Sequence, residues 1–164
     1  MDWTVRDVAK MIDHSLLNPV LTWAELEKGC AIAREMDVAS VCILPYALKR
    51  CAEILKGSAV KASTTIGFPH GGHARAVKVV EAKQALADGG EELDMVVNIS
   101  AVKSGRWDLV ADEIRELTDL THAAGQKIKV IFENCHLSDD EKIRLCGICA
   151  EAKADWVKIG RAHV

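Results

Sequence analysis

Two charged residues interrupt apolar stretches of the chain, and both could act on a carbonyl compound. Lys158 closes the segment ADWVK, and Asp94 lies within ELDMVV. A neutral lysine amine attacks carbonyl carbon, but its free pKa of about 10.4 must first be lowered by burial or a nearby cation. A carboxylate inside an apolar strand needs a cation or hydroxyl partner. From the residues alone, Lys158 is either a nucleophile or a lysine that reaches solvent from a strand end, and Asp94 is either a catalytic carboxylate or part of a structural salt bridge.

Further polar residues fall where the short apolar runs end. They are Asp13, Cys42, Asn98 and Glu133, in addition to Asp94 and Lys158. The mouth of a parallel barrel collects one or two such groups from the carboxyl end of each strand. Lys129 and Glu133 share strand parity in KIKVIFE, so both are predicted to point to one side of the sheet.

The elements that position these residues follow from an alternation of β-branched, apolar runs with segments of helical period. Strands are predicted near 38–44, 60–68, 92–99, 127–133 and 154–158. The helices between them have start signals at Pro45 and at two candidate capping boxes, Thr22 with Glu25 and Ser138 with Glu141. Such alternation predicts βαβ units and a parallel α/β sheet, either open and doubly wound or closed as a barrel. The chain lacks a Gly-x-Gly-x-x-Gly or phosphate loop, which favours the barrel.

Length and charge narrow the functional classes. The 164 residues are 49% hydrophobic, which suits a single domain over 1–164. The net charge of −3 is not concentrated in runs, so neither nucleic acid nor a membrane surface is an expected partner. There is no apolar stretch near the roughly 20 residues of a membrane span and no secretory pattern, so we expect a cytoplasmic location.

The cysteines and histidines do not form a metal or disulfide pattern. Six cysteines lack framework spacing, and the CGIC pair lies within a helical segment, so we expect buried structural thiols rather than a redox or zinc site. His70 and His73 in GFPHGGH have no third ligand and are better explained by a tight loop. We expect neither a metal nor a cofactor.

Six segments in order resemble the deoxyribose-phosphate aldolase family. They are IDHSLLNP, VCILPYAL, TTIGFPHGGH, ELDMVVNI, KVIFENCHLSDDEKI and ADWVK, which together cover nearly all of residues 8–158. The resemblance implies a (β/α)₈ TIM barrel in deoxyribonucleotide catabolism. It also implies reversible cleavage of 2-deoxy-D-ribose 5-phosphate to glyceraldehyde 3-phosphate and acetaldehyde through a lysine Schiff base, without a metal.

The resemblance assigns roles to particular residues. Lys158 matches the Schiff-base lysine, Asp94 the aspartate that relays protons through water, and Lys129 its relay or electrostatic partner. Cys42 matches a pocket residue beside the bound aldehyde, and Asp13 and Ser15 match a first-strand motif at the mouth. For these last three, a structural hydrogen-bond role is equally expected.

The chain supplies only part of such a barrel, which takes about 250 residues and eight strands. We expect an incomplete barrel of five to six βα units, with residues 159–164 a non-native tail and the second family lysine and phosphate loops absent. Open edges predict a homodimer or higher homo-oligomer, completed by edge pairing or segment exchange. The leading hypothesis is an aldolase of reduced or lost activity. The alternatives are an inactive, self-associating barrel fragment and, more weakly, another sugar-phosphate lyase or isomerase.

Overall fold

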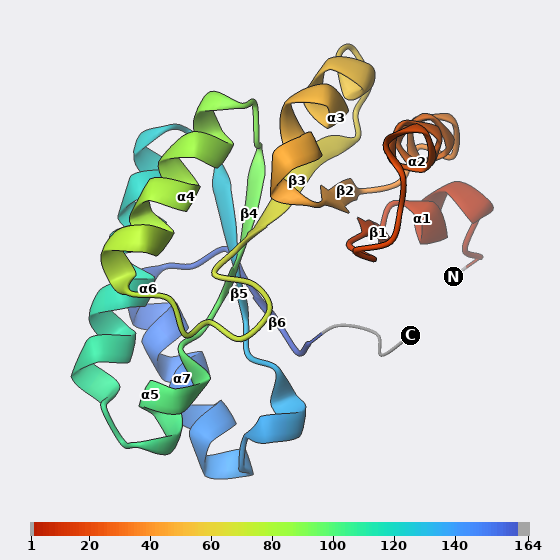
Figure 1. The fold of residues 1–164 in the computed structure, drawn as a ribbon. Helices are drawn as coiled ribbons and strands as arrows, with labels where there is room; N and C mark the ends of the chain where they lie inside the picture. The colour runs from red at the N-terminus through yellow and green to blue at the C-terminus, as the bar shows by residue number, and fades with distance from the viewer. Residues whose placement is uncertain (1, 161–164) are drawn as a thin grey trace. The chain divides into compact units, whose positions relative to one another are not determined.

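The chain divides into two compact units. The computed structural model describes residues 2–160, with helices and strands alternating along the chain (Figure 1). One unit comprises residues 1–65 and 85–92, and the other comprises 66–84 and the residues from 93 onward. Each unit has its own buried core. None of the helices in residues 2–160 is long and apolar enough to cross a membrane.

The first unit contains three neighbouring parallel strands. These are β1 (Asp13–Leu16), β2 (Ser40–Ile43) and β3 (Lys61–Ile66). The register places Asp13 opposite Ser40 and Ile43 opposite Thr64. Parallel neighbours require crossover helices, and α2 (Trp23–Glu35) and α3 (Leu48–Leu55) supply them.

The core of the first unit forms where α2 packs on α3 and on the strands. Leu26 and Cys30 of α2 and Leu48 and Cys51 of α3 are buried, as is all of β2. The short 3₁₀ turn η1 (Pro45–Ala47) leads into α3, so the helix signal at Pro45 is confirmed with an irregular first turn. A short helix that the sequence analysis did not predict, α1 (Val5–Ala9), precedes β1.

The second unit repeats the strand–helix alternation. Its strands are β4 (Glu92–Val96), β5 (Lys127–Ile131) and β6 (Trp156–Lys158), in that order, and β5 pairs with β6 in parallel. Its helices are α4 (Arg75–Ala87), α5 (Ile99–Lys103), α6 (Trp107–Ala123) and α7 (Asp139–Ala152), with the 3₁₀ turn η2 (Asn134–His136) after β5. The predicted parallel α/β class is confirmed, and α5 was not foreseen.

Both predicted capping boxes are present. Thr22 and Glu25 cap α2, and Ser138 and Glu141 cap α7, each with the reciprocal side-chain and backbone bonds. Two otherwise unpaired N–H groups are thus satisfied at each helix start. These local signals fix where α2 and α7 begin.

Strand β6 differs from the expectation of a buried strand. Trp156 is 40% exposed and Val157 is 46% exposed. The reason is that β6 stands last in the strand order, so its ladder pairs it with β5 alone among the described strands. The predicted non-native tail includes residues 161–164, which lie outside the described residues.

Candidate active site

Three neighbouring strands of the second unit each contribute one charged side chain to a single cluster. Lys158 of β6 donates from Nζ to Oδ2 of Asp94 on β4 at 2.7 Å. Lys129 of β5 places its Nζ 3.4 Å from Oδ1 of the same carboxylate. The three residues that the sequence analysis put forward as catalytic therefore meet, with Asp94 between two amines.

The members of this lysine–carboxylate cluster differ in exposure. The side chain of Asp94 is fully buried and that of Lys129 is 9% exposed, whereas that of Lys158 is 26% exposed. Two cations compensate the cost of burying the carboxylate. Of the two amines, Lys158 is the more accessible to a small molecule from solvent.

Backbone hydrogen bonds hold the strands that carry the cluster. The register of β5 and β6 places Ile131 opposite Lys158. Beyond the end of β5, the Phe132 N–H donates to the Lys158 carbonyl and the Asn134 N–H to the Ile159 carbonyl, both at 2.8 Å. These hydrogen bonds therefore hold the main chain at Lys158 and at the residue that follows it.

Trp156 is a member of the site that the sequence analysis did not identify. Its ring centroid lies 4.9 Å from Nζ of Lys129, and also 4.9 Å from Nζ of Lys127. A cation over an indole face is attracted by about 0.5–2 kcal/mol. The sequence held one signal for this: Trp156 stands two residues before Lys158 on the same strand, so the two side chains lie on the same face of the sheet.

Parity had predicted that Glu133 lies in the same strand as Lys129 and points to the same side of the sheet, but Glu133 lies outside that strand. Strand β5 ends at Ile131, and Glu133 adopts φ 55° and ψ 64°, in the left-handed region. The two-residue repeat therefore breaks before Glu133, and parity no longer decides where its side chain points. Glu133 is nonetheless buried, 6% exposed.

The three predicted substrate contacts belong to the first unit. Ser15 lies opposite Cys42 in the β1–β2 register; Ser15 is exposed and Cys42 is buried. Asp13 begins β1 and does not end it, so its expected place at a strand's carboxyl end is wrong. It accepts a hydrogen bond from the Ser40 hydroxyl at 2.7 Å, opposite it in the register, because β1 pairs with β2 from Asp13 onward.

The expectation of buried thiols holds for four of the six cysteines. Cys30, Cys42, Cys51 and Cys149 are buried, whereas Cys135 and Cys146 are exposed. In α7 the buried positions are Leu145, Cys149 and Ala152, a spacing that turns Cys146 outward.

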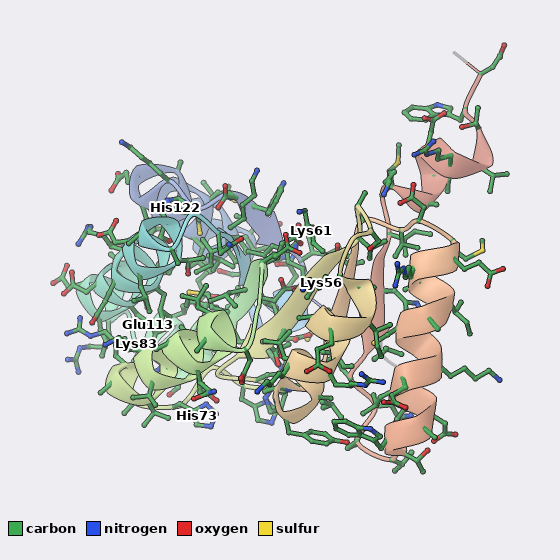
Figure 2. The ribbon with its side chains drawn as sticks, turned by 90° about the horizontal axis from the view of Figure 1, so that it is seen from above. Lys56, Lys61, His73, Lys83, Glu113 and His122 are labelled. Carbon is green, nitrogen blue, oxygen red and sulfur yellow. The ribbon has the colours of Figure 1, made fainter. Side chains whose placement is uncertain are left out.

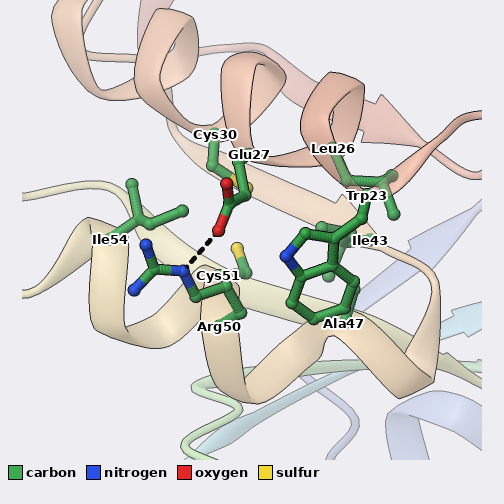
Figure 3. Close-up of a pocket in the computed structure, with 9 residues that line it drawn as sticks. All are labelled: Trp23, Leu26, Glu27, Cys30, Ile43, Ala47, Arg50, Cys51 and Ile54. Carbon is green, nitrogen blue, oxygen red and sulfur yellow. Dashed lines mark hydrogen bonds and ion pairs between the residues drawn. The ribbon is translucent and has the colours of Figure 1, made fainter.

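A hollow in the first unit lies between α2 and α3 (Figure 3). Its empty volume is about 160 Å³, below the roughly 300 Å³ at which ligand pockets begin. The side chains of Glu27 and Arg50 form an ion pair across it, with Nε and Oε1 2.7 Å apart. This hollow is a packing gap, and the lysine–carboxylate cluster is the stronger candidate site.

A partly exposed lysine beside a buried carboxylate, on neighbouring strands of a parallel sheet, is an arrangement that can form a Schiff base with a carbonyl compound. Comparison with known families identifies the class of protein. The family model described as DeoC/LacD family aldolase matches residues 7–162. The chain belongs to this aldolase family.

Individual relatives show the same similarity. The chain is 68% identical over 162 residues to the deoxyribose-phosphate aldolase of Rhodopirellula baltica, and 47% identical over 156 residues to that of Caldanaerobacter subterraneus subsp. tengcongensis. These alignments cover 99% and 94% of the chain but 67% and 68% of the relatives. The chain therefore spans about two thirds of the curated relatives' length.

Solved structures extend the comparison to the fold. The structure described as a tetrameric deoxyribose phosphate aldolase from Aeropyrum pernix matches with a TM-score of 0.88 at 28% identity, covering 96% of the chain and 65% of that structure. A second, described as QR15, an aldolase, matches with a TM-score of 0.86 at 38% identity, covering 92% and 66%. The predicted fold class is confirmed as part of an aldolase barrel.

Proposed function

We propose that the chain carries the Schiff-base machinery of a deoxyribose-phosphate aldolase, with Lys158 as the nucleophile. The observation that supports this most directly is the 2.7 Å contact between Nζ of Lys158 and the buried carboxylate of Asp94. The substrate is 2-deoxy-D-ribose 5-phosphate, cleaved reversibly to glyceraldehyde 3-phosphate and acetaldehyde. Assayed by themselves, these 164 residues, which span about two thirds of the relatives' length, are expected to have low activity.

The chemistry assigns one task to each member of the cluster. The Lys158 amine adds to the aldehyde carbon, and loss of water from the resulting carbinolamine gives the protonated imine. The bond between C2 and C3 of the sugar then breaks, its electron pair forms an enamine, and the proton leaves the C3 hydroxyl. Protonation of the enamine and hydrolysis release acetaldehyde and restore the lysine. Asp94 relays protons during formation and hydrolysis of the carbinolamine, and Lys129 supports the charge of Asp94.

Reductive trapping tests this proposal. The full chain is incubated with acetaldehyde and borohydride, and the alkylated lysines are identified by peptide mass spectrometry. We expect modification at Lys158 well above that of every other lysine, and strong suppression of this trapping in D94N. Modification spread evenly over the surface lysines would overturn the proposal.

A matched control comes from β5. Lys127 and Lys129 lie at the same distance from the Trp156 ring, but only Lys129 also reaches Asp94. K127M should therefore leave trapping at Lys158 unchanged, whereas K158M should abolish it. Release of acetaldehyde from 2-deoxy-D-ribose 5-phosphate, followed with both variants, then tests the substrate assignment separately.

We also propose that the chain forms a homo-oligomer. The support is the exposed apolar edge at β6, where Trp156, Val157 and Ile159 are 40%, 46% and 73% exposed, and the relative described as tetrameric. Light scattering at micromolar concentration tests this, and a monodisperse monomer would overturn it. An oligomer without trapping at Lys158 would favour the alternative of an inactive, self-associating fragment. A cytoplasmic location is proposed as well and can be tested by cell fractionation.

A further inference from the structure

A second buried charge pair lies in the second unit, outside the lysine–carboxylate cluster. Lys78 of α4 places Nζ 2.8 Å from Oε2 of Glu113 on α6, and their side chains are 0% and 1% exposed. Glu113 is labelled in Figure 2 beside α4. Burying an ion pair this deeply has a large desolvation cost, and apolar residues could join the two helices equally well. A further role for the pair should therefore be visible in its other contacts.

The second contact of Lys78 is with the strand that carries Asp94. Its Nζ also donates to the carbonyl oxygen of Val96 at 2.8 Å. Val96 is the last residue of β4, two positions after Asp94. Immediately beyond it, the Val97 N–H donates to the Ile131 carbonyl, at the end of β5, at 3.0 Å. The carboxyl end of β4 is thus held by α4 through Lys78 and by β5 through the backbone.

The loop before α4 is shaped around the lysine stem. A Cβ atom at Gly67 would lie 2.5 Å from Cε and 3.1 Å from Cδ of Lys78. The Gly67 N–H donates to Oε2 of Glu81, on the same helix, at 2.9 Å. Glycine at this position leaves room for the stem to reach β4, so the path of Lys78 is built into the loop.

Burial and mutual attraction act in opposite directions on the charges of Lys78 and Glu113. Burial lowers the pKa of Lys78, and burial raises the pKa of Glu113, while the attraction between the two charges opposes both changes. The backbone of Asn98, two residues after the end of β4, works to a smaller extent to lower the pKa of Glu113. The pair contacts β4 itself through Lys78, at the carbonyl oxygen of the last residue of that strand.

We propose that Lys78 and Glu113 are positioning residues for Asp94. By fixing the carboxyl end of β4, the pair holds the Asp94 carboxylate in reach of Lys158 and Lys129. The effect on chemistry rests on the proposed function, whereas the effect on the Asp94 carboxylate does not. Both residues act through the strand, because Lys78 reaches β4 at Val96, two positions after Asp94, and Glu113 is paired with Lys78.

The test compares K78M with R75M in the full chain. Arg75 joins the same two helices through an exposed ion pair with Glu116, with Nε and Oε2 3.0 Å apart. Because a misplacement of about 1 Å can cost about 100-fold in rate, we expect K78M to slow trapping of acetaldehyde at Lys158 by about 10- to 100-fold. R75M should stay within about twofold of the wild type.

A double-mutant cycle separates positioning from general loss of stability. If Lys78 acts through Asp94, K78M should slow trapping in the wild type but add little in a D94N background. Equal slowing in both backgrounds would overturn the proposal. E113Q preserves the shape of the side chain and removes its charge, so it replaces K78M in the cycle if K78M does not fold.

A measurement independent of catalysis keeps the two proposals distinguishable. The NMR resonance of the Asp94 carboxyl carbon and the exchange rate of the Val97 amide report on β4 even if Lys158 proves unreactive. K78M or E113Q should shift the Asp94 resonance and speed Val97 exchange by about tenfold or more, while R75M should change neither. Absence of trapping in the wild type with these changes present would refute only the proposed function. An unchanged Asp94 resonance in a folded E113Q variant would refute the positioning role.

Discussion

Replacing Gly71 by alanine tests how closely the loop between β3 and α4 packs against the end of β4, the strand that carries Asp94. Gly71 has φ +67°, and its added Cβ would lie 1.9 Å from the Val97 carbonyl oxygen and 2.6 Å from the Val97 carbonyl carbon. Both are backbone atoms, so no side chain can rotate away to make room. Either the loop or the end of β4 must move.

Gly105 supplies the reference for the magnitude. Its φ is +66°, and a Cβ there would meet none of the described atoms within 4 Å. In G105A, left-handed strain should lower the free energy of unfolding by about 1–2 kcal/mol. Alanine also lowers the entropy of the unfolded chain, which offsets about 0.4–1 kcal/mol of that loss. G71A carries the same terms plus overpacking of about 1–3 kcal/mol. We expect the free energy of unfolding of G71A to fall below that of G105A by about 2 kcal/mol.

Urea unfolding of the two variants measures this difference. With a slope of about 2 kcal/mol per molar urea, G71A should unfold at about 1 M less urea than G105A. G71A should also slow trapping at Lys158, because β4 carries Asp94. Equal urea midpoints for the two variants would refute the reasoning, since they would mean that the loop does not press on Val97 in solution.

Two further predictions concern the charges of β5 and its neighbours. K129M should slow trapping at Lys158 by about tenfold, or about 1.4 kcal/mol, because it removes one of the two cations beside the buried Asp94 carboxylate. K127M, which does not reach Asp94, should react like the wild type, and equal loss in both variants would contradict this. Burial works to raise the pKa of Asp155, but its hydrogen bonds, including one to His122, outweigh burial and lower that pKa below 3.8. The Asp155 carboxylate thus adds stability above its unfolded pKa that is lost as pH falls through the folded value. The urea midpoints of the wild type and D155N should therefore differ at neutral pH and begin to converge only as the pH falls below about 4.

Local signals in the sequence were sufficient for much of the fold. Thr22 and Ser138 begin their helices as predicted, because a capping box involves residues only three apart. The apolar runs predicted β2 to β6, each of which is shorter than its run, but they did not predict β1. Asp94 stood out as a buried carboxylate, which required a cation or a hydroxyl nearby, and the structure provides two cations in Lys158 and Lys129.

The remaining features depend on contacts between distant residues. Lys78 and Glu113 are 35 positions apart, and in its helical segment Lys78 reads as an ordinary surface lysine. Only the packing of α4 against α6 and β4 buries it. Glu133 was misplaced because the backbone turns left-handed after β5, and nothing in KIKVIFE signals that change.

The ladder around Lys158 has a consequence for how fast the site can respond. Its main chain is held by hydrogen bonds from β5 and from the residues just beyond it, while its side chain is partly open to solvent. Exchange of the amine between Asp94 and an incoming aldehyde then requires only rotation about side-chain bonds, which takes picoseconds to nanoseconds in exposed residues. Such a motion is far faster than enzymatic turnover. The rate at this lysine would therefore be limited by bond making and proton transfer, and not by rearrangement of the strand.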